Sequence, residues 1–184
     1  APHREGAPGP PIRAAVHEAW TRDTYVMAHS HTDESARLSA ELGVRTIEHG
    51  TLINRASTAR LMADKGVFLV PTCSVVHVLV DHGVELRIPA DKAALIRGIW
   101  NDMLASIELC HREGVKLGFG TDLLGTEFHP LQGGEFQLRA NVQSNLDVLR
   151  SATHINAEIL NKSGELGCIA AGACATVKRS ADRI

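Results

Sequence analysis

Short apolar runs alternate with longer amphipathic segments four times along this chain, and this alternation limits the fold more than any other feature. The apolar runs, which predict strands, cover residues 24–28, 44–47, 67–70 and 115–119. The predicted helices between and beyond them cover residues 12–22, 33–42, 55–65 and 90–113. Such alternation predicts a parallel sheet with right-handed crossovers, and uninterrupted apolar strands indicate that both faces are covered. Doubly wound sheets and TIM (β/α)8 barrels both fit this α/β pattern.

Turn and capping signals set the expected boundaries. Asp33 is a predicted N-cap, and Gly43, Gly66 and Gly114 stand where helices are expected to end. Residues 73–89 are predicted to be a long connection, and three further helices are expected at residues 132–141, 146–152 and 154–160. We therefore divide the chain into an irregular segment (1–11), a partial barrel domain (12–163) and a tail rich in small residues (164–184).

Composition and charge argue against several classes of protein. The net charge is -2 and no basic stripe is present, so nucleic-acid binding is not expected. The longest apolar stretch, residues 67–80, is too short and too polar to span a membrane, and the Gly/Pro-rich start lacks the apolar core of a signal peptide. The four cysteines form no CxxC motif, which favours reduced thiols in a cytoplasmic protein over a zinc–cysteine site.

Side chains able to bind a metal follow three of the four predicted strands. They are His29, His49 and Asp122. In a parallel barrel the C-terminal ends of all strands open on one face, so these residues would converge there. Imidazole and carboxylate suit zinc or a similar divalent ion, which lowers the pKa of a bound water to about 7. Two ordinary explanations stay open: His49 as a polar strand-end residue, and Asp122 as a helix N-cap.

The motifs at the strand ends and beyond occur in the order found in a known family. They are Met27-Ala-His-Ser-His31, Thr46-Ile-Glu-His-Gly50, Phe68-Leu-Val-Pro-Thr72, Gly118-Phe-Gly-Thr-Asp122, Arg150-Ser-Ala-Thr-His-Ile-Asn-Ala157 and the segment 164–173. Together they resemble the amidohydrolase superfamily, in its branch of imidazolonepropionase-like and prolidase-like dipeptidases. The resemblance covers residues 12–173. It implies a TIM barrel with a small β-sandwich built from both termini, and a remnant of that sandwich is expected in the C-terminal tail.

The resemblance also implies roles for individual residues. His29 would be the ligand after strand 5, His49 the ligand after strand 6, and Asp122 the strand 8 residue that binds metal and acts as general base. One or two divalent ions, expected to be zinc, would be the cofactor. We expect His31 on the opposite face of its strand from His29, so that only one of the two is a ligand. Contacts with a small peptide or amide substrate are assigned to His31, His77 and His129.

The leading interpretation is a metal-dependent hydrolase of amide bonds, a dipeptidase or carboxypeptidase that uses metal-activated hydroxide. The same site could instead hydrolyse lactones, cyclic amides or esters. An alternative of another class is a non-catalytic half-barrel that binds a metal or a partner. Arg139 and Arg150 are further candidates for binding a substrate carboxylate, although solvated helix faces explain both more simply.

Two departures from the family pattern affect this interpretation. The family's first HxH pair and its carboxylated lysine would lie upstream of Ala1, and Val76 and His77 stand where related dipeptidases often carry an aromatic residue. We therefore expect the C-terminal half of a barrel, with four parallel strands. Because its edges would be open, such a half-barrel is expected to form homo-oligomers, to aggregate, or to need the missing half.

Overall fold

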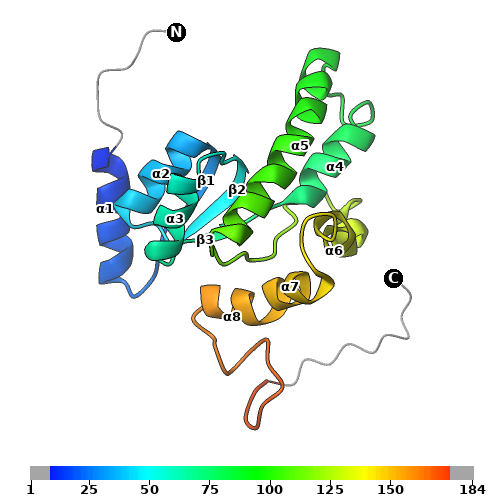
Figure 1. The fold of residues 1–184 in the computed structure, drawn as a ribbon. Coiled ribbons are helices and arrows are strands. Elements are labelled where there is room, and N and C mark those ends of the chain that lie inside the picture. The colour runs from blue at the N-terminus through cyan, green and yellow to red at the C-terminus, as the bar shows by residue number, and fades with distance from the viewer. Residues whose placement is uncertain (1–8, 175–184) are drawn as a thin grey trace.

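The computed structural model describes residues 9–174, and its centre is a parallel sheet of three strands (Figure 1). The strands are β1 (Met27–Thr32), β2 (Thr46–Leu52) and β3 (Phe68–Val70), in the order β1-β2-β3. Met27 pairs with Thr46, and Thr46 with Phe68, so the three strands start level with one another. Their carboxyl ends therefore open at one edge of the sheet, as the sequence predicted.

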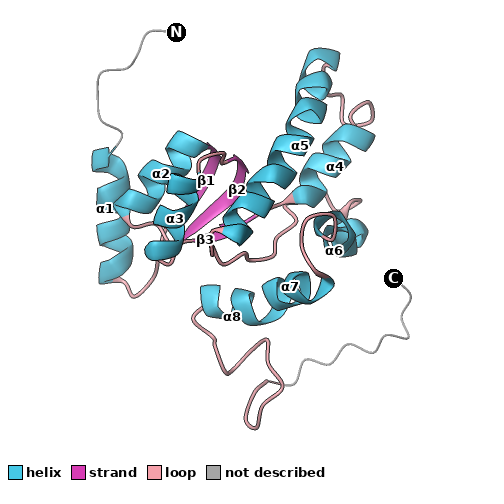
Figure 2. Cartoon of the chain, viewed as in Figure 1, coloured by secondary structure: helices cyan, strands magenta, loops and turns pink. Residues whose placement is uncertain are grey.

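Helices make up most of the remaining described residues (Figure 2). The longer ones are α1 (Gly9–Thr21), α2 (Asp33–Leu42), α3 (Ala56–Asp64), α4 (Cys73–Asp81) and α5 (Ala90–Arg112). The later ones are short: the 3-10 helix η1 (His129–Gly133), α6 (Gly134–Arg139), α7 (Asn145–Arg150), the π-helical turn η2 (Ser151–Ile155) and α8 (Asn156–Ile159). In Figure 1, α1, α2 and α3 lie side by side next to the strands, with α4 and α5 beyond β2 and β3.

Two predicted irregular segments are helical in the structure. Helix α1 begins at Gly9, inside the segment expected to be irregular, because Pro10 and Pro11 are compatible with the first turn of a helix. Helix α4 occupies the first half of residues 73–89, which were predicted to be a connection. Its many valines have low helix propensity, but the burial of Val75, Val76 and Val78 favours the helix.

The fourth predicted strand, residues 115–119, is not confirmed as a strand. It lies beside β3 in the parallel direction, joined by a single bridge between Leu69 and Leu117. Side chains form hydrogen bonds with the backbone groups that a longer strand pairing would use. Asn156 accepts from the amide of Phe119 and donates to its carbonyl (2.8 and 2.9 Å), while Arg139 donates to the carbonyl of Gly118 (2.6 Å). The order of segments around the sheet is nevertheless the predicted one.

The hydrophobic core lies between the sheet and helices α2, α3 and α5. Its buried members include Ala36, Ala40, Ile47, Ala59, Met62, Leu69, Met103 and Ile107. Each large side chain among them contributes about 1.5–3 kcal/mol by leaving water. This packing holds the strands and therefore fixes the positions of their carboxyl ends.

The N-cap of α2 lies one residue before the predicted one. Thr32 is the N-cap and accepts a hydrogen bond from the amide of Ser35 at 3.2 Å, so the prediction of Asp33 as N-cap was wrong. The buried Asp33 carboxylate instead accepts from the amides of Asn54 and Arg55, at the start of α3. Gly43 ends α2 in the left-handed conformation (φ 93°), as predicted.

The C-terminal tail shows no part of a β-sandwich in the described residues. Residues 161–174 form turns, with one isolated bridge between Ser163 and Leu166. The expected sandwich remnant is therefore not confirmed for this segment, and residues 175–184 lie outside the described residues. No helix between residues 9 and 174 has both the length and the apolar character needed to cross a membrane.

Candidate metal centre

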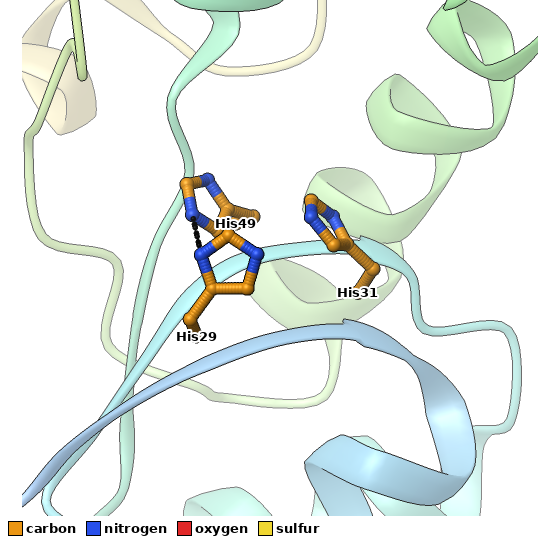
Figure 3. Close-up of side chains that lie close together, drawn as sticks. All are labelled: His29, His31 and His49. Carbon is orange, nitrogen blue, oxygen red and sulfur yellow. Dashed lines mark hydrogen bonds between the residues drawn. The ribbon is translucent and has the colours of Figure 1, made fainter.

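Three histidines meet at the carboxyl edge of the sheet (Figure 3). His29 and His31 come from β1, and His49 comes from β2. One ring nitrogen from each lies within 4.8 Å of those of the other two. His49 Nε2 and His29 Nδ1 are 2.9 Å apart and share a hydrogen bond. In the described part of the chain, this is the one cluster of three or more His, Cys, Asp or Glu side chains with such geometry.

The predicted separation of His29 and His31 onto opposite faces was wrong. Residues two apart in a strand point to the same face, and the two rings lie 4.7 Å apart, edge to face. The register of β1 against β2 also shifts between Ser30 and Thr32, which brings His31 level with the end of β2. His31 therefore belongs to the histidine cluster.

The backbone within β2 has an unusual conformation at two consecutive residues. His49 has φ 73° and the following Gly50 has φ 54°, both in the left-handed region that most residues avoid. Such a conformation costs of order 1–3 kcal/mol for a residue other than glycine and is characteristic of functional sites. The buried hydroxyl of Ser106 on α5 donates to the carbonyl of Gly50 at 2.6 Å. Packing and this bond hold the His49 imidazole toward His29.

Threonine hydroxyls hold two of the three imidazoles from behind. His49 Nδ1 is hydrogen-bonded to Thr72 Oγ1 at 2.8 Å, and His31 Nδ1 to Thr51 Oγ1 at 2.9 Å. Both threonines are buried. Such partners fix the orientation and tautomer of a histidine and leave its other nitrogen for a ligand. Neither threonine was predicted as a site residue, although Thr72 lies in the motif that ends the third strand.

The surroundings of two of the imidazoles favour their neutral form. Burial, with the neighbouring His29, lowers the pKa of His31. Burial also lowers the pKa of His49, helped by His29 and His31 and opposed by the charge of Asp122. A neutral imidazole has a free lone pair for a metal ion, so the site favours metal binding near neutral pH.

Asp122 lies close to the cluster without being a member of it. Its carboxylate is exposed, and its charge acts on both His49 and Glu48. Like His49, Asp122 has a left-handed backbone (φ 50°) at the end of its segment. Glu48, which was not predicted, has a pKa raised by burial and by Asp122, and its carboxylate accepts from Thr46 Oγ1 at 2.5 Å.

The other predicted substrate residues lie on helices after the strands. His77, on α4, is exposed and paired with Asp81 at 3.2 Å, and it lines a cavity of about 450 Å³ between α4 and the η1–α6 segment. His129 is the exposed first residue of η1. Neither belongs to the histidine cluster, and their contacts with substrate stay predictions.

Arg139 was expected on a solvated helix face and is instead fully buried. It donates to the carbonyl of Gly118 and to the side chains of Gln143 and Ser151. Its bonds to the protein therefore occupy the guanidinium that was considered for a substrate carboxylate. Arg150, the second such candidate, is exposed on α7, as expected.

The histidine cluster has the composition that a divalent ion requires. Three imidazole nitrogens suit zinc and related ions, and two nitrogen ligands of a tetrahedral zinc ion lie roughly 3.4 Å apart. The 2.9 Å between His29 and His49 is close to that value. Hydrogen bonds behind the rings of His49 and His31 complete the fit.

Comparison with known proteins agrees with the geometry. The model of the amidohydrolase family matches residues 6–176. This chain belongs to the amidohydrolase family. Its membership confirms the resemblance drawn from the strand-end motifs. No curated protein sequence matches the chain.

Solved structures of amidohydrolases share its fold. One is a prolidase complexed with N-methylphosphonate-L-proline, with 46% identity and a TM-score of 0.83. The match covers 88% of this chain and 39% of the prolidase chain. Another is described as an amidohydrolase (44% identity, TM-score 0.82, 88% and 39%). A third is a Xaa-Pro dipeptidase with bound methionine in the active site (26% identity, TM-score 0.77, 89% and 40%). The chain thus spans about two fifths of the length of these relatives, and the dipeptidase-like branch is confirmed.

Proposed function

We propose that this chain contributes the carboxyl-edge part of the active site of a metal-dependent hydrolase that cleaves amide bonds in small peptides. The cluster of His29, His31 and His49 carries this proposal. Family membership and the dipeptidases among the structural relatives support it. Because a relative at 46% identity is described as a prolidase bound to a proline analogue, the proposed substrates are dipeptides that end in proline.

The proposed ligands are His29, His49 and Asp122, with zinc as the expected ion. One or two ions could be held, since His31 offers a further imidazole next to the first two. A divalent ion bound here supplies a Lewis acid and lowers the pKa of water to about 7. Thr72 and Thr51 keep the imidazoles in place. His31, an exposed member of the cluster, is also available to contact the substrate.

In the proposed reaction Asp122 moves the proton. Water adds to the carbonyl carbon of the scissile amide and loses a proton to the Asp122 carboxylate. The C–N bond then breaks, and the same proton passes to the leaving nitrogen. The exposed position of Asp122 beside His49 suits this transfer, since a base must reach both water and substrate.

The test uses the zinc-loaded chain and dipeptides of the form Xaa-Pro. We expect hydrolysis that a chelator abolishes and that added zinc restores. Asp122→Asn should lower the rate by about 10²–10⁴-fold, the usual contribution of a general base. Asp102→Asn, an exposed aspartate on α5, is the matched control and should leave the rate unchanged. An unchanged rate in Asp122→Asn would refute the proposed base. Zinc binding without turnover by the parent would favour the non-catalytic half-barrel.

A further inference from the structure

Thr72 is an N-cap residue whose hydroxyl does not cap its own helix. It precedes α4, and its side chain accepts no hydrogen bond from the first turn. A threonine at this position ordinarily bonds to an amide two or three residues on. Here its Oγ1 bonds instead to His49 Nδ1. Another group satisfies the first amides of α4.

That group is Glu135, a fully buried residue of α6 that is distant in sequence. Its Oε1 accepts from the amide of Cys73 at 3.2 Å, and its Oε2 accepts from the amide and the hydroxyl of Ser74, both at 2.7 Å. A carboxylate at a helix N-terminus is also favoured by the helix dipole. Glu135 thus replaces the local cap of α4.

The same part of α6 also connects to the segment that carries Asp122. Arg139, one turn after Glu135, donates to the carbonyl of Gly118. The amide of Val75 in α4 donates to the carbonyl of Thr121 at 3.1 Å. The start of α4 therefore contacts both the His49 side and the Asp122 side of the candidate centre. Glu135 lies at the point where these connections meet.

From this arrangement we infer that Glu135 is a positioning residue for the metal centre: by capping α4, it leaves the Thr72 hydroxyl free to orient His49. The inference rests on the proposed role of His49 as a metal ligand. In Glu135→Gln, the side-chain amide has one accepting oxygen in place of two, so at least one of the hydrogen bonds from Cys73 and Ser74 is lost. The Thr72 hydroxyl then turns to the α4 amides that have lost their partner. It no longer bonds to His49 Nδ1, so the imidazole loses its preferred tautomer.

A double-mutant cycle tests the inference with two measurements. The first is the ¹⁵N chemical shifts of the His49 ring in the metal-free chain, which report the tautomer. The second is the zinc dissociation constant. We expect Glu135→Gln and Thr72→Val each to shift the His49 tautomer and to weaken zinc binding about 10–100-fold. The double variant should bind zinc about as weakly as the weaker single variant, since both changes break one connection. Thr72→Ser keeps the hydroxyl and should therefore retain the parent His49 shifts and zinc affinity.

Controls separate positioning from simple stabilisation. Ser144→Ala removes the N-cap of another helix, α7, and should lower the melting temperature without moving the His49 shifts or the zinc affinity. If Glu135→Gln does not fold, Ser74→Ala removes one of the three donors to Glu135 and should give a smaller change of the same kind.

The outcomes divide clearly. A lower melting temperature in Glu135→Gln with unchanged His49 shifts and zinc affinity would overturn the inference, and so would additive losses in the double variant. A tautomer shift in both single variants of a chain that binds no zinc would support the positioning role while refuting the proposed function.

Discussion

The two ends of the parallel sheet carry opposite kinds of side chain. At the carboxyl ends, each of the four parallel segments contributes a polar group to the candidate centre. These groups are His29, His49, Thr72 and Asp122. At the amino ends, each segment contributes to a cation–aromatic cluster made of Tyr25, Arg45, Phe68 and Lys116. The same four segments therefore build two different layers of side chains, the candidate centre at their carboxyl ends and the cation–aromatic cluster at their amino ends.

The amino-end cluster fastens α8 to the sheet. Arg45 lies over the rings of Tyr25 and Phe68, 5.2 and 5.4 Å from their centroids. It also donates to the carbonyls of Glu158 and Ile159 at the end of α8 (2.6 and 3.2 Å). No left-handed backbone occurs at these four positions. In parallel α/β barrels, residues at the amino face serve stability and those at the carboxyl face serve chemistry.

The largest expected effect is the loss of metal binding in His29→Ala. Removal of an exposed ligand should weaken zinc binding by more than the roughly 10–100-fold that a supporting residue costs. The free energy of unfolding of the metal-free chain should change little, because the side chain is exposed. Isothermal titration with zinc and urea denaturation measure the two quantities. His154→Ala, an exposed histidine on η2, is the control, and equal zinc affinity in both variants would contradict the account.

The reverse effect is expected for Arg45→Ala at the other end of the sheet. Its loss removes hydrogen bonds to two carbonyls and contacts with two rings, so the free energy of unfolding should fall by about 2 kcal/mol. Zinc affinity of the folded chain should stay within about twofold, since no contact reaches the histidines. A strong loss of zinc affinity would show that the two layers are coupled.

A smaller effect of pH on the free energy of unfolding is expected, and it should come from the histidines at the carboxyl ends of the strands. Folding lowers the pKa values of His31 and His49 below the ordinary 6.5, so the unfolded chain binds more protons as pH falls through that value. The metal-free chain should therefore lose stability as pH falls from about 7 to below 6.5. Urea unfolding at several pH values above 5 measures this slope. His31→Gln should reduce the slope, and an equal slope in that variant would exclude His31 as a source.

The smallest effect is expected from Lys116→Ala. Its ammonium lies 2.5 Å from the Glu158 carboxylate, but both side chains are partly exposed, and such pairs contribute about 0–1 kcal/mol. The difference in unfolding free energy from the parent should shrink further in high salt. A loss as large as that of Arg45→Ala would mean that charge, rather than the hydrogen bonds of Arg45, fastens α8.

The contrast between local and distant signals explains what the sequence could predict. The apolar runs place the three strands approximately, and Gly43 marks the end of α2, because these signals act within a few residues. Strands β1 and β2 nevertheless extend beyond the runs at residues 24–28 and 44–47 into the histidine motifs. His29 and His49 could be placed because parallel strands end on one edge. The fourth strand was overpredicted because its apolar pattern is correct while Asn156 and Arg139, far along the chain, take its backbone bonds.

The remaining features of the site depend on contacts without a local signature. Glu135 caps a helix that begins 62 residues before it, and nothing in its own neighbourhood indicates that role. Arg139 was interpreted as a surface residue because it belongs to a short polar helix, yet its partners bury it completely. The position of His31 could have been predicted from the HxH motif, because residues two apart in a strand point to the same face. The prediction of opposite faces for His29 and His31 misapplied this rule.

The most direct test of the central claim is X-ray absorption spectroscopy at the zinc edge of the zinc-loaded, dialysed chain. The account predicts retained zinc with two or three imidazoles among its ligands, at about 2.0–2.1 Å, and fewer imidazoles in His49→Ala. A spectrum without imidazole scattering, or complete loss of zinc on dialysis, would contradict the claim that His29, His31 and His49 form a metal centre.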